Sequence, residues 1–145
     1  MLIFLLNTTQ SLYGVVDNLS VLQPNDDAAT VNWGNGWCMP SGAQWLELRL
    51  NVNSTWENRN GVYGCLFTSS NGNSLFLPAA CNGWDEDFNY TYDNYWSSSL
   101  YVDDPIFAQN FVFPSNNNSG WGVGRCGREA GLQVRAVRSF SRNKP

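Results

Sequence analysis

The sequence predicts an α+β domain that consists mostly of short antiparallel strands with one main helix. The observations behind this are one helical pattern near residues 41–51, a tight-turn signal at Asn71-Gly72, and a series of short strand-like segments after residue 95. One helix followed by many short strands is typical of the α+β class. A chain of 145 residues can bury one hydrophobic core, so we expect a single domain over residues 1–145.

The N-terminal segment MLIFLLN is expected to form the first strand. It is too short for the apolar core of a signal peptide and has no basic flank, so no signal peptide is visible. The trimmed start of a longer gene product is the alternative. The next segment, residues 22–37, contains Pro24, Gly34 and Gly36 and is expected to be a loop.

The main helix is expected at residues 41–51. Ser41 can cap its N-terminus, and Gln44, three residues later, can complete a capping box. Trp45 and Leu48 lie at helical spacing and give the helix an apolar face that should supply core.

Residues 61–80 are expected to form a hairpin, because two apolar runs flank Asn71-Gly72. This dipeptide tolerates the positive φ angles of a tight turn.

Four further strands are expected near residues 95–100, 106–113, 121–126 and 132–138. Side chains alternate between the two faces of a strand. Phe111 and Phe113 should therefore be buried together with Trp96. Asn110 and Val112 have the opposite parity and are expected to face outward.

Composition and charge exclude several classes of function. The net charge of −4 gives no basic footprint for phosphates, so nucleic acid is not an expected partner. The chain has no His, which removes the commonest general base and the commonest metal ligand. No segment is long and apolar enough to span a bilayer, so direct membrane insertion is not expected. We expect no catalytic residue, no bound metal and no cofactor.

Four cysteines, Cys38, Cys65, Cys81 and Cys126, show no zinc-site spacing. Their even number permits two disulfides, which would suit an extracytoplasmic protein, and reduced structural thiols are the alternative. The acidic run of Asp85, Glu86 and Asp87 is expected to be a solvated loop. It has no EF-hand pattern, and carboxylates adjacent in sequence do not face a common point as acid–base catalysis requires.

Five blocks of the sequence, taken in order, resemble the Fibrobacter succinogenes major paralogous domain family. They are DDAATVNWGNGWCMPSGAQWLEL, NGNSLFLPAA, NYWSSS, the spacing A-x-x-F-x-F and the closing motif R-x-x-G-x-x-VRAVR. Together they cover about residues 25–138. The resemblance implies a C-type-lectin-like fold, related to formylglycine-generating enzymes, in a surface or secreted bacterial protein. The usual opening strand of the family is replaced by MLIFLLNTTQSLYG, which suggests a truncated copy.

The resemblance also implies roles for the C-terminal residues. Formylglycine-generating enzymes use a reactive cysteine pair that Cys126 alone does not supply, so no enzyme is implied. In the closing motif, Arg128 and Arg135 are expected to donate hydrogen bonds to loop carbonyls, with Gly131 in an unusual backbone conformation. Anion binding by the two arginines is the alternative.

In lectin-like folds the late strands and their loops form the exposed ligand-binding face. The resemblance therefore implies a non-enzymatic module that binds a protein or a glycan outside the cytoplasm. A structural or accessory domain of a bacterial surface protein, without its own ligand, is the alternative. The candidate ligand-binding residues are Tyr101, Asp103, Asp104, Phe107, Asn110, Val112, Trp121, Val123 and Arg125.

Similar lectin-like domains serve as variable proteins of diversity-generating retroelements in bacteria and phages. There, adenines in Asn codons are randomised, so a variable position cannot become Trp, Gln, Glu, Lys or Met. The candidate residues satisfy this restriction except Trp121, which would have to be fixed, as would Gln109 and Glu129. The pattern permits diversification without requiring it, and an undiversified paralogue is the alternative.

Overall fold

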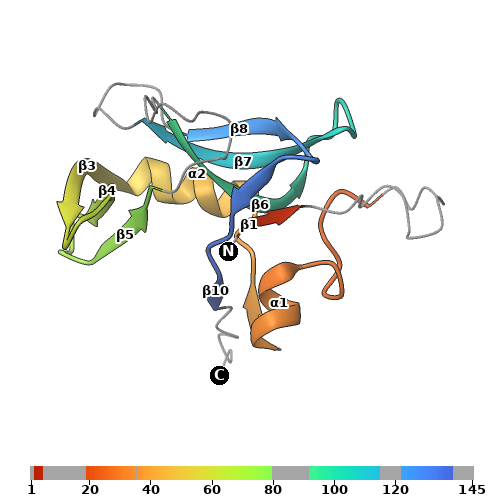
Figure 1. Ribbon diagram of the computed structural model, residues 1–145, viewed down its shortest axis with the longest axis horizontal. Helices are drawn as coiled ribbons and strands as arrows, with labels where there is room; N and C mark the ends of the chain where they lie inside the picture. Colours follow the sequence, from red (N-terminus) through yellow and green to blue (C-terminus); the bar gives the residue numbers. More distant parts are fainter. Residues whose placement is uncertain (1, 5–18, 35, 80–91, 115–121, 139–145) are drawn as a thin grey trace.

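The computed structural model describes residues 2–4, 19–34, 36–79, 92–114 and 122–138. These residues form a small α+β domain of mostly antiparallel strands, which confirms the predicted fold class at this level (Figure 1). The prediction that residues 1–145 form one domain stays a prediction. No helix in the described ranges is long and apolar enough to cross a bilayer.

Within the described residues, the largest sheet has five strands in the order β1-β9-β6-β7-β8. Their bounds are β1 Leu2–Phe4, β9 Gly131–Gln133, β6 Tyr92–Leu100, β7 Phe107–Pro114 and β8 Gly122–Gly127. A three-stranded sheet contains β3 Val52–Arg59, β4 Val62–Ser69 and β5 Ser74–Pro78. A short ladder pairs β2 Trp37–Cys38 with β10 Val137–Arg138. The helices are α1 Ala28–Trp33 and α2 Gly42–Asn51.

The predicted main helix is α2, and its capping box is present. The Ser41 side chain accepts from the Gln44 backbone N–H at 3.2 Å, and the Gln44 side chain accepts from the Ser41 N–H at 2.8 Å. The end of the Gln109 side chain of β7 lies against Gly42, in the space that a β-carbon at this position would occupy. Trp45 is buried and its ring stacks on Phe111 at 4.6 Å.

The hairpin at Asn71-Gly72 is confirmed by the pairing of β4 with β5 and by a φ of 85° at Gly72. A second hairpin, β3–β4, was not predicted. Its turn, Asn60-Gly61, has φ values of 53° and 87°, the backbone geometry that this dipeptide favours in hairpins. The same dipeptide signal was present in the sequence, but residues 52–59 alternate too weakly in hydrophobicity to mark a strand.

The predicted loop at residues 22–37 is wrong over part of its length, because it contains α1. Asp27 caps this helix: one carboxylate oxygen accepts from the N–H groups of Ala29 and Thr30 at 2.8 and 2.9 Å. The other oxygen accepts from the Met39 N–H at 2.8 Å. Asp27 is only 4% exposed, so the helix depends on a buried cap rather than on a periodic apolar pattern.

Each face of the five-stranded sheet packs against a core cluster of its own, and this corrects the predicted parity of Trp96. Phe111 and Phe113 share one face with Tyr95 and pack against Trp45 and Phe67 of α2 and β4. Trp96 lies on the opposite face.

That second face is covered by a separate core cluster formed by Leu22, Ala28, Ala29, Met39, Trp96, Ala108, Ala130 and Leu132. Asn110 lies on the same face as Trp96, with which it pairs, and is 2% exposed, so the prediction that it faces outward is wrong. Val112 is half-buried. The prediction assumed one solvent-facing side, whereas the segment containing α1 covers it.

The three serines after Trp96 connect β6 to the start of α2. The register of β6 against β7 shifts between Trp96 and Leu100. The Ser98 N–H donates to the Pro40 carbonyl at 2.8 Å, and the Ser99 hydroxyl accepts from the Gly42 N–H at 3.1 Å. These serines therefore have a structural role.

The predictions for the two ends of the chain had different outcomes. Leu2–Phe4 does form a first strand and pairs with β9. The single strand predicted at residues 132–138 is wrong: β9 ends at Gln133, and β10 begins at Val137 in a different sheet. This break lets the chain leave the main sheet and pair with β2.

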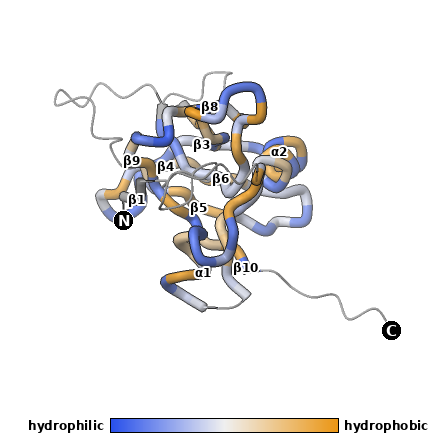
Figure 2. The backbone as a smooth tube through the Cα atoms, turned by 90° about the vertical axis from the view of Figure 1, so that its right-hand side faces the viewer, coloured by the Kyte–Doolittle hydropathy of each residue, from blue (hydrophilic) through white to orange (hydrophobic). Residues whose placement is uncertain are grey.

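Figures 1 and 2 show α1 and β10 together at the lower end of both views, with β8 at the upper end.

Candidate functional site

The turn between β6 and β7 carries several of the predicted binding residues. The Asp104 N–H donates to the Tyr101 carbonyl at 3.3 Å, and the Phe107 N–H donates to the Asp104 carbonyl at 3.1 Å. The Asp104 carboxylate accepts from the Ile106 N–H at 3.2 Å. Asp103 is exposed at the tip of the turn. Asp104 is half-buried, and one of its carboxylate oxygens accepts the hydrogen bond within the turn. Asp104 therefore shapes the turn, and Asp103 is the carboxylate available to a ligand.

Arg125 on β8 joins this turn through its side chain. Its guanidinium carbon lies 4.8 Å from the ring centre of Tyr101 and 5.0 Å from that of Phe107. Arg125 is exposed, and the two rings are half-buried. Both distances lie within the range of favourable cation–π contacts. The structure thus brings together three of the predicted residues from three successive elements.

Exposed aliphatic side chains accompany this cluster. Val102 and Ile106, in the same turn, are 72% and 63% exposed, and Val123, on the same face of β8 as Arg125, is 36% exposed. We call Tyr101, Val102, Asp103, Ile106, Phe107, Val123 and Arg125 the Arg125 surface. Val102 and Ile106 were not predicted as binding residues. The β-branched residues on either side of the DDP motif are a pattern in the sequence that could have indicated them.

Asn110 and Val112 do not belong to the Arg125 surface. They pair with Gly124 and Gly122, which places them on the opposite face of the sheet from Val123 and Arg125. The Asn110 side chain donates to the Asn94 side chain at 2.9 Å inside the fold. The structure therefore does not bring these two predicted residues to the Arg125 surface. Trp121, the remaining candidate, lies outside the described residues.

Arg128 stabilises the turn between β6 and β7 through a hydrogen bond. It is 6% exposed, and its guanidinium donates to the Pro105 carbonyl at 3.0 Å, which confirms its predicted role as a tie to a loop carbonyl. Arg135 is exposed and has no such bond among the described residues. Gly131 has no positive φ, unlike Gly34 and Gly122, so its predicted unusual conformation is wrong.

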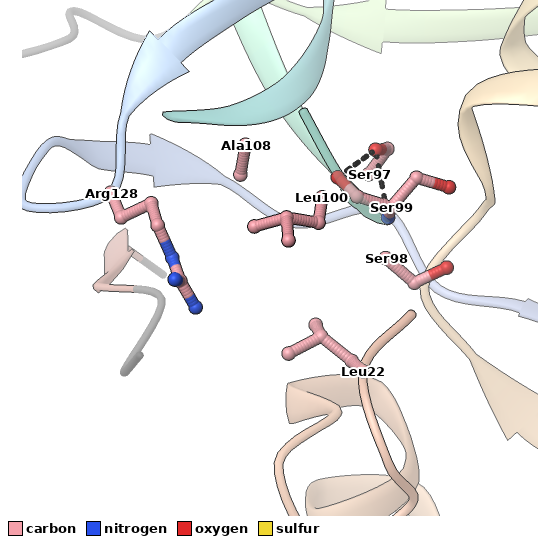
Figure 3. Close-up of a pocket in the computed structure, with 7 residues that line it drawn as sticks. All are labelled: Leu22, Ser97, Ser98, Ser99, Leu100, Ala108 and Arg128. Carbon is pink, nitrogen blue, oxygen red and sulfur yellow. Dashed lines mark hydrogen bonds between the residues drawn. The ribbon is translucent and has the colours of Figure 1, made fainter. Parts of the chain in front are cut away.

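An internal pocket beside Arg128 has a volume of only about 10 Å³ (Figure 3). Its lining comes from four regions of the chain: Leu22, Ser97, Ser98, Ser99, Leu100, Ala108 and Arg128. A space of this size holds about one water molecule. The pocket is therefore part of the packing and not a ligand site.

The three cysteines within the described residues give no sign of reactivity. Cys38, Cys65 and Cys126 are free thiols, which favours the alternative of reduced structural cysteines, and Cys81 lies outside the described residues. Burial raises the pKa of each of these three thiols above its ordinary value. Protonated thiols are poor nucleophiles and poor metal ligands. Across the described ranges, no group of three or more Cys, Asp or Glu side chains could hold a metal ion. The acidic run at residues 85–87 lies outside these ranges.

The Cys65 thiol gives a testable pH dependence. Burial raises its pKa from 9.0 to about 11, so the folded state retains the proton at pH values where the unfolded chain loses it. This contribution to stability is fully present below pH 9.0 and is lost as pH rises towards about 11. We expect the free energy of unfolding to fall more steeply with pH in wild type than in Cys65→Ala. Denaturant unfolding between those pH values measures this, and parallel pH profiles would contradict it.

Comparison of the chain with protein-family models, with curated proteins and with solved structures found no match. The resemblance to the paralogous domain family thus stays a prediction. The arrangement of the side chains on the Arg125 surface is the feature that points to a function.

Proposed function

We propose that this chain is a non-enzymatic binding module that engages a protein ligand through the Arg125 surface. The observation that carries the proposal is the position of the Arg125 guanidinium over Tyr101 and Phe107, at 4.8 and 5.0 Å, beside exposed aliphatic side chains. Tyr and Arg are enriched among the residues that contribute most to protein interfaces. Stacking also fixes the long Arg125 side chain before binding, which lowers the entropy lost in the complex.

A protein fits this surface better than a glycan, the other ligand class implied by the sequence. Val102, Ile106 and Val123 offer apolar area that a protein partner can desolvate, and they offer no hydrogen bonds to sugar hydroxyls. Asp103 and Arg125 add one charge of each sign at the rim, which suits electrostatic complementarity with a protein.

The scaffold is, in this proposal, a C-type-lectin-like domain displayed outside the cytoplasm. Its support is the position of the surface on the late strands β7 and β8 and the turn before β7, the region that carries ligands in lectin-like folds. Diversification by a retroelement is a further part of the proposal, since Tyr101, Asp103, Phe107, Val123 and Arg125 satisfy the codon restriction. A reverse transcriptase gene beside a near-repeat of the 3′ end of this gene would support diversification.

A structural or accessory domain without its own ligand is the second candidate. The half-burial of Tyr101 and Phe107 is the observation in its favour, because rings that mainly stabilise the turn would be covered in this way. The exposure of Val102 and Ile106 favours binding.

The test is a binding screen of the full chain against an array of extracellular protein domains and against a glycan array. We expect a protein ligand whose binding is lost in the Asp103→Ala/Phe107→Ala/Arg125→Ala variant. Because these side chains contribute little to the core, the melting temperature should change by only a few degrees.

The matched control is Arg59→Ala, which removes a guanidinium lying 5.1 Å from the ring of Phe76 in the other sheet. This variant should retain the ligand. If the array yields no protein ligand, or if the triple variant binds it as well as wild type, the proposal is wrong. Unfolding of the triple variant would show that the three residues serve the core and would favour the structural candidate.

A further inference from the structure

Two adjoining concavities lie beside β2 and the segment leading to β10. Helix α1 contributes Trp33 to one of them, and α2 and β5 line the other. Their volumes are about 360 Å³ and about 370 Å³, which is in the range of small-ligand sites. They share Trp37, Arg135 and Ala136 in their linings. No residue of the Arg125 surface lines either concavity, so this double groove is separate from that surface. Figures 1 and 2 show α1 and β10 at the end of the molecule remote from β8.

Two indole rings flank the double groove. Trp33, the last residue of α1, lines one concavity and is 52% exposed; Trp37 of β2 lines both and is 37% exposed. The backbone that carries them is held in place, since the Thr30 hydroxyl donates to the Trp37 carbonyl at 2.8 Å and Trp37 pairs with Arg138. Exposure of a tryptophan ring to water is unfavourable in free energy. Because the backbone that carries these two rings is fixed, they favour an apolar ring as the binding partner.

Two arginines complete the lining. Arg135 and Arg138 are both exposed, and the guanidinium of Arg138 lies 6.0 Å from the Trp37 ring centre. Within the described part of the chain, the ion pair present is Arg59 with Glu57, so neither lining arginine is neutralised there. The guanidinium fork matches the two oxygens of a carboxylate.

We propose that this double groove binds a carboxylated sugar within an oligosaccharide. A pyranose ring presents an apolar C–H face that packs on indole, and the sugar carboxylate would pair with Arg135 or Arg138. The net charge of −4 disfavours a dense polyanion, whose repulsion by the whole protein would oppose two local arginines. Isolated carboxylates on a neutral sugar frame fit this charge distribution. The proposal does not depend on the Arg125 surface.

Isothermal titration of the full chain with two acidic probes that each carry a single carboxylate, glucuronosyl-xylotriose and 3′-sialyllactose, tests the proposal. Their uncharged counterparts, the carboxylate methyl esters of the two probes, are the ligand controls. We expect saturable binding of at least one acidic probe with a Kd of about 1 mM or tighter, and at least about 10-fold weaker binding of its counterpart. The acidic probe that binds identifies whether hexuronate or sialate is the source of the carboxylate.

The site variant is Arg135→Gln/Arg138→Gln, and the control Arg49→Gln/Arg59→Gln makes the same change in net charge at residues that line neither concavity. We expect the site variant to lose at least about 10-fold in affinity and the control to keep it, with Trp33→Ala weakening both acidic and neutral binding. The proposal is overturned if both charge variants lose the same affinity for the acidic probe, or if the acidic probe and its ester bind equally well. It is likewise overturned if neither acidic probe binds with a Kd below about 10 mM. It is also overturned if the site variant loses only a protein ligand from the domain array.

Discussion

Phe111→Ala is expected to lower the free energy of unfolding by about 3–5 kcal/mol, as for other buried aromatic residues truncated to alanine. Phe111 is 0% exposed, stacks on Trp45 at 4.6 Å, and lies 5.7 Å from the Phe67 ring. The three rings come from β7, α2 and β4, so the truncation opens a cavity where the two sheets and the helix meet. Urea unfolding followed by tryptophan fluorescence would measure the change.

The control for this experiment is Tyr63→Ala on β4. Tyr63 is 59% exposed, and its ring lies 6.5 Å from that of Trp56. Its loss should cost no more than about 1 kcal/mol, because it removes one exposed stacking contact and leaves no cavity. A Phe111→Ala effect as small as that of Tyr63→Ala would show that Phe111 does not lie at the centre of the core.

Asp27→Ala is expected to cost about 2–4 kcal/mol. The substitution removes the α1 cap, worth about 1 kcal/mol, and leaves the buried Met39 N–H without its acceptor, worth about 1–3 kcal/mol. The three hydrogen bonds involved are 2.8, 2.9 and 2.8 Å long. Denaturant unfolding would measure the loss of stability.

Two variants test this interpretation of Asp27. Asp27→Asn keeps one carbonyl oxygen and should retain part of the stability, because a single acceptor can serve either the cap or Met39 but not both. Asp26→Ala removes an exposed neighbouring carboxylate and should change stability by no more than about 0.5 kcal/mol. If Asp26→Ala and Asp27→Ala had the same effect, general surface charge rather than the buried cap would be responsible.

The parts of the fold that the sequence predicted correctly are those set by local chemistry. Ser41 with Gln44 and the turn at Asn71-Gly72 depend on residues a few positions apart, and both formed as expected. Helix α1 was missed because one buried carboxylate, Asp27, defines it by bridging to Met39, 12 positions away. Such a bridge leaves no periodic pattern in the sequence.

The candidate site was predicted in part for the same reason. Tyr101, Phe107 and Arg125 lie on adjacent elements, so strand pairing brings them together as the sequence suggested. Asn110 failed because its face of the sheet is covered by the segment that contains α1, and parity alone cannot reveal which faces are covered. The double groove was not predicted, because the break between β9 and β10 that forms it interrupts a regular apolar alternation.

Hydrogen–deuterium exchange of the full chain, with and without the protein ligand found on the domain array, tests the central claim most directly. A ligand seated on the Arg125 surface should slow exchange of the backbone amides in the turn at residues 101–106 and in β8. Exchange in the β3–β4 hairpin and around the double groove should stay unchanged. Protection confined to either of those regions, with the turn and β8 unaffected, would contradict the claim that this surface is where the protein binds.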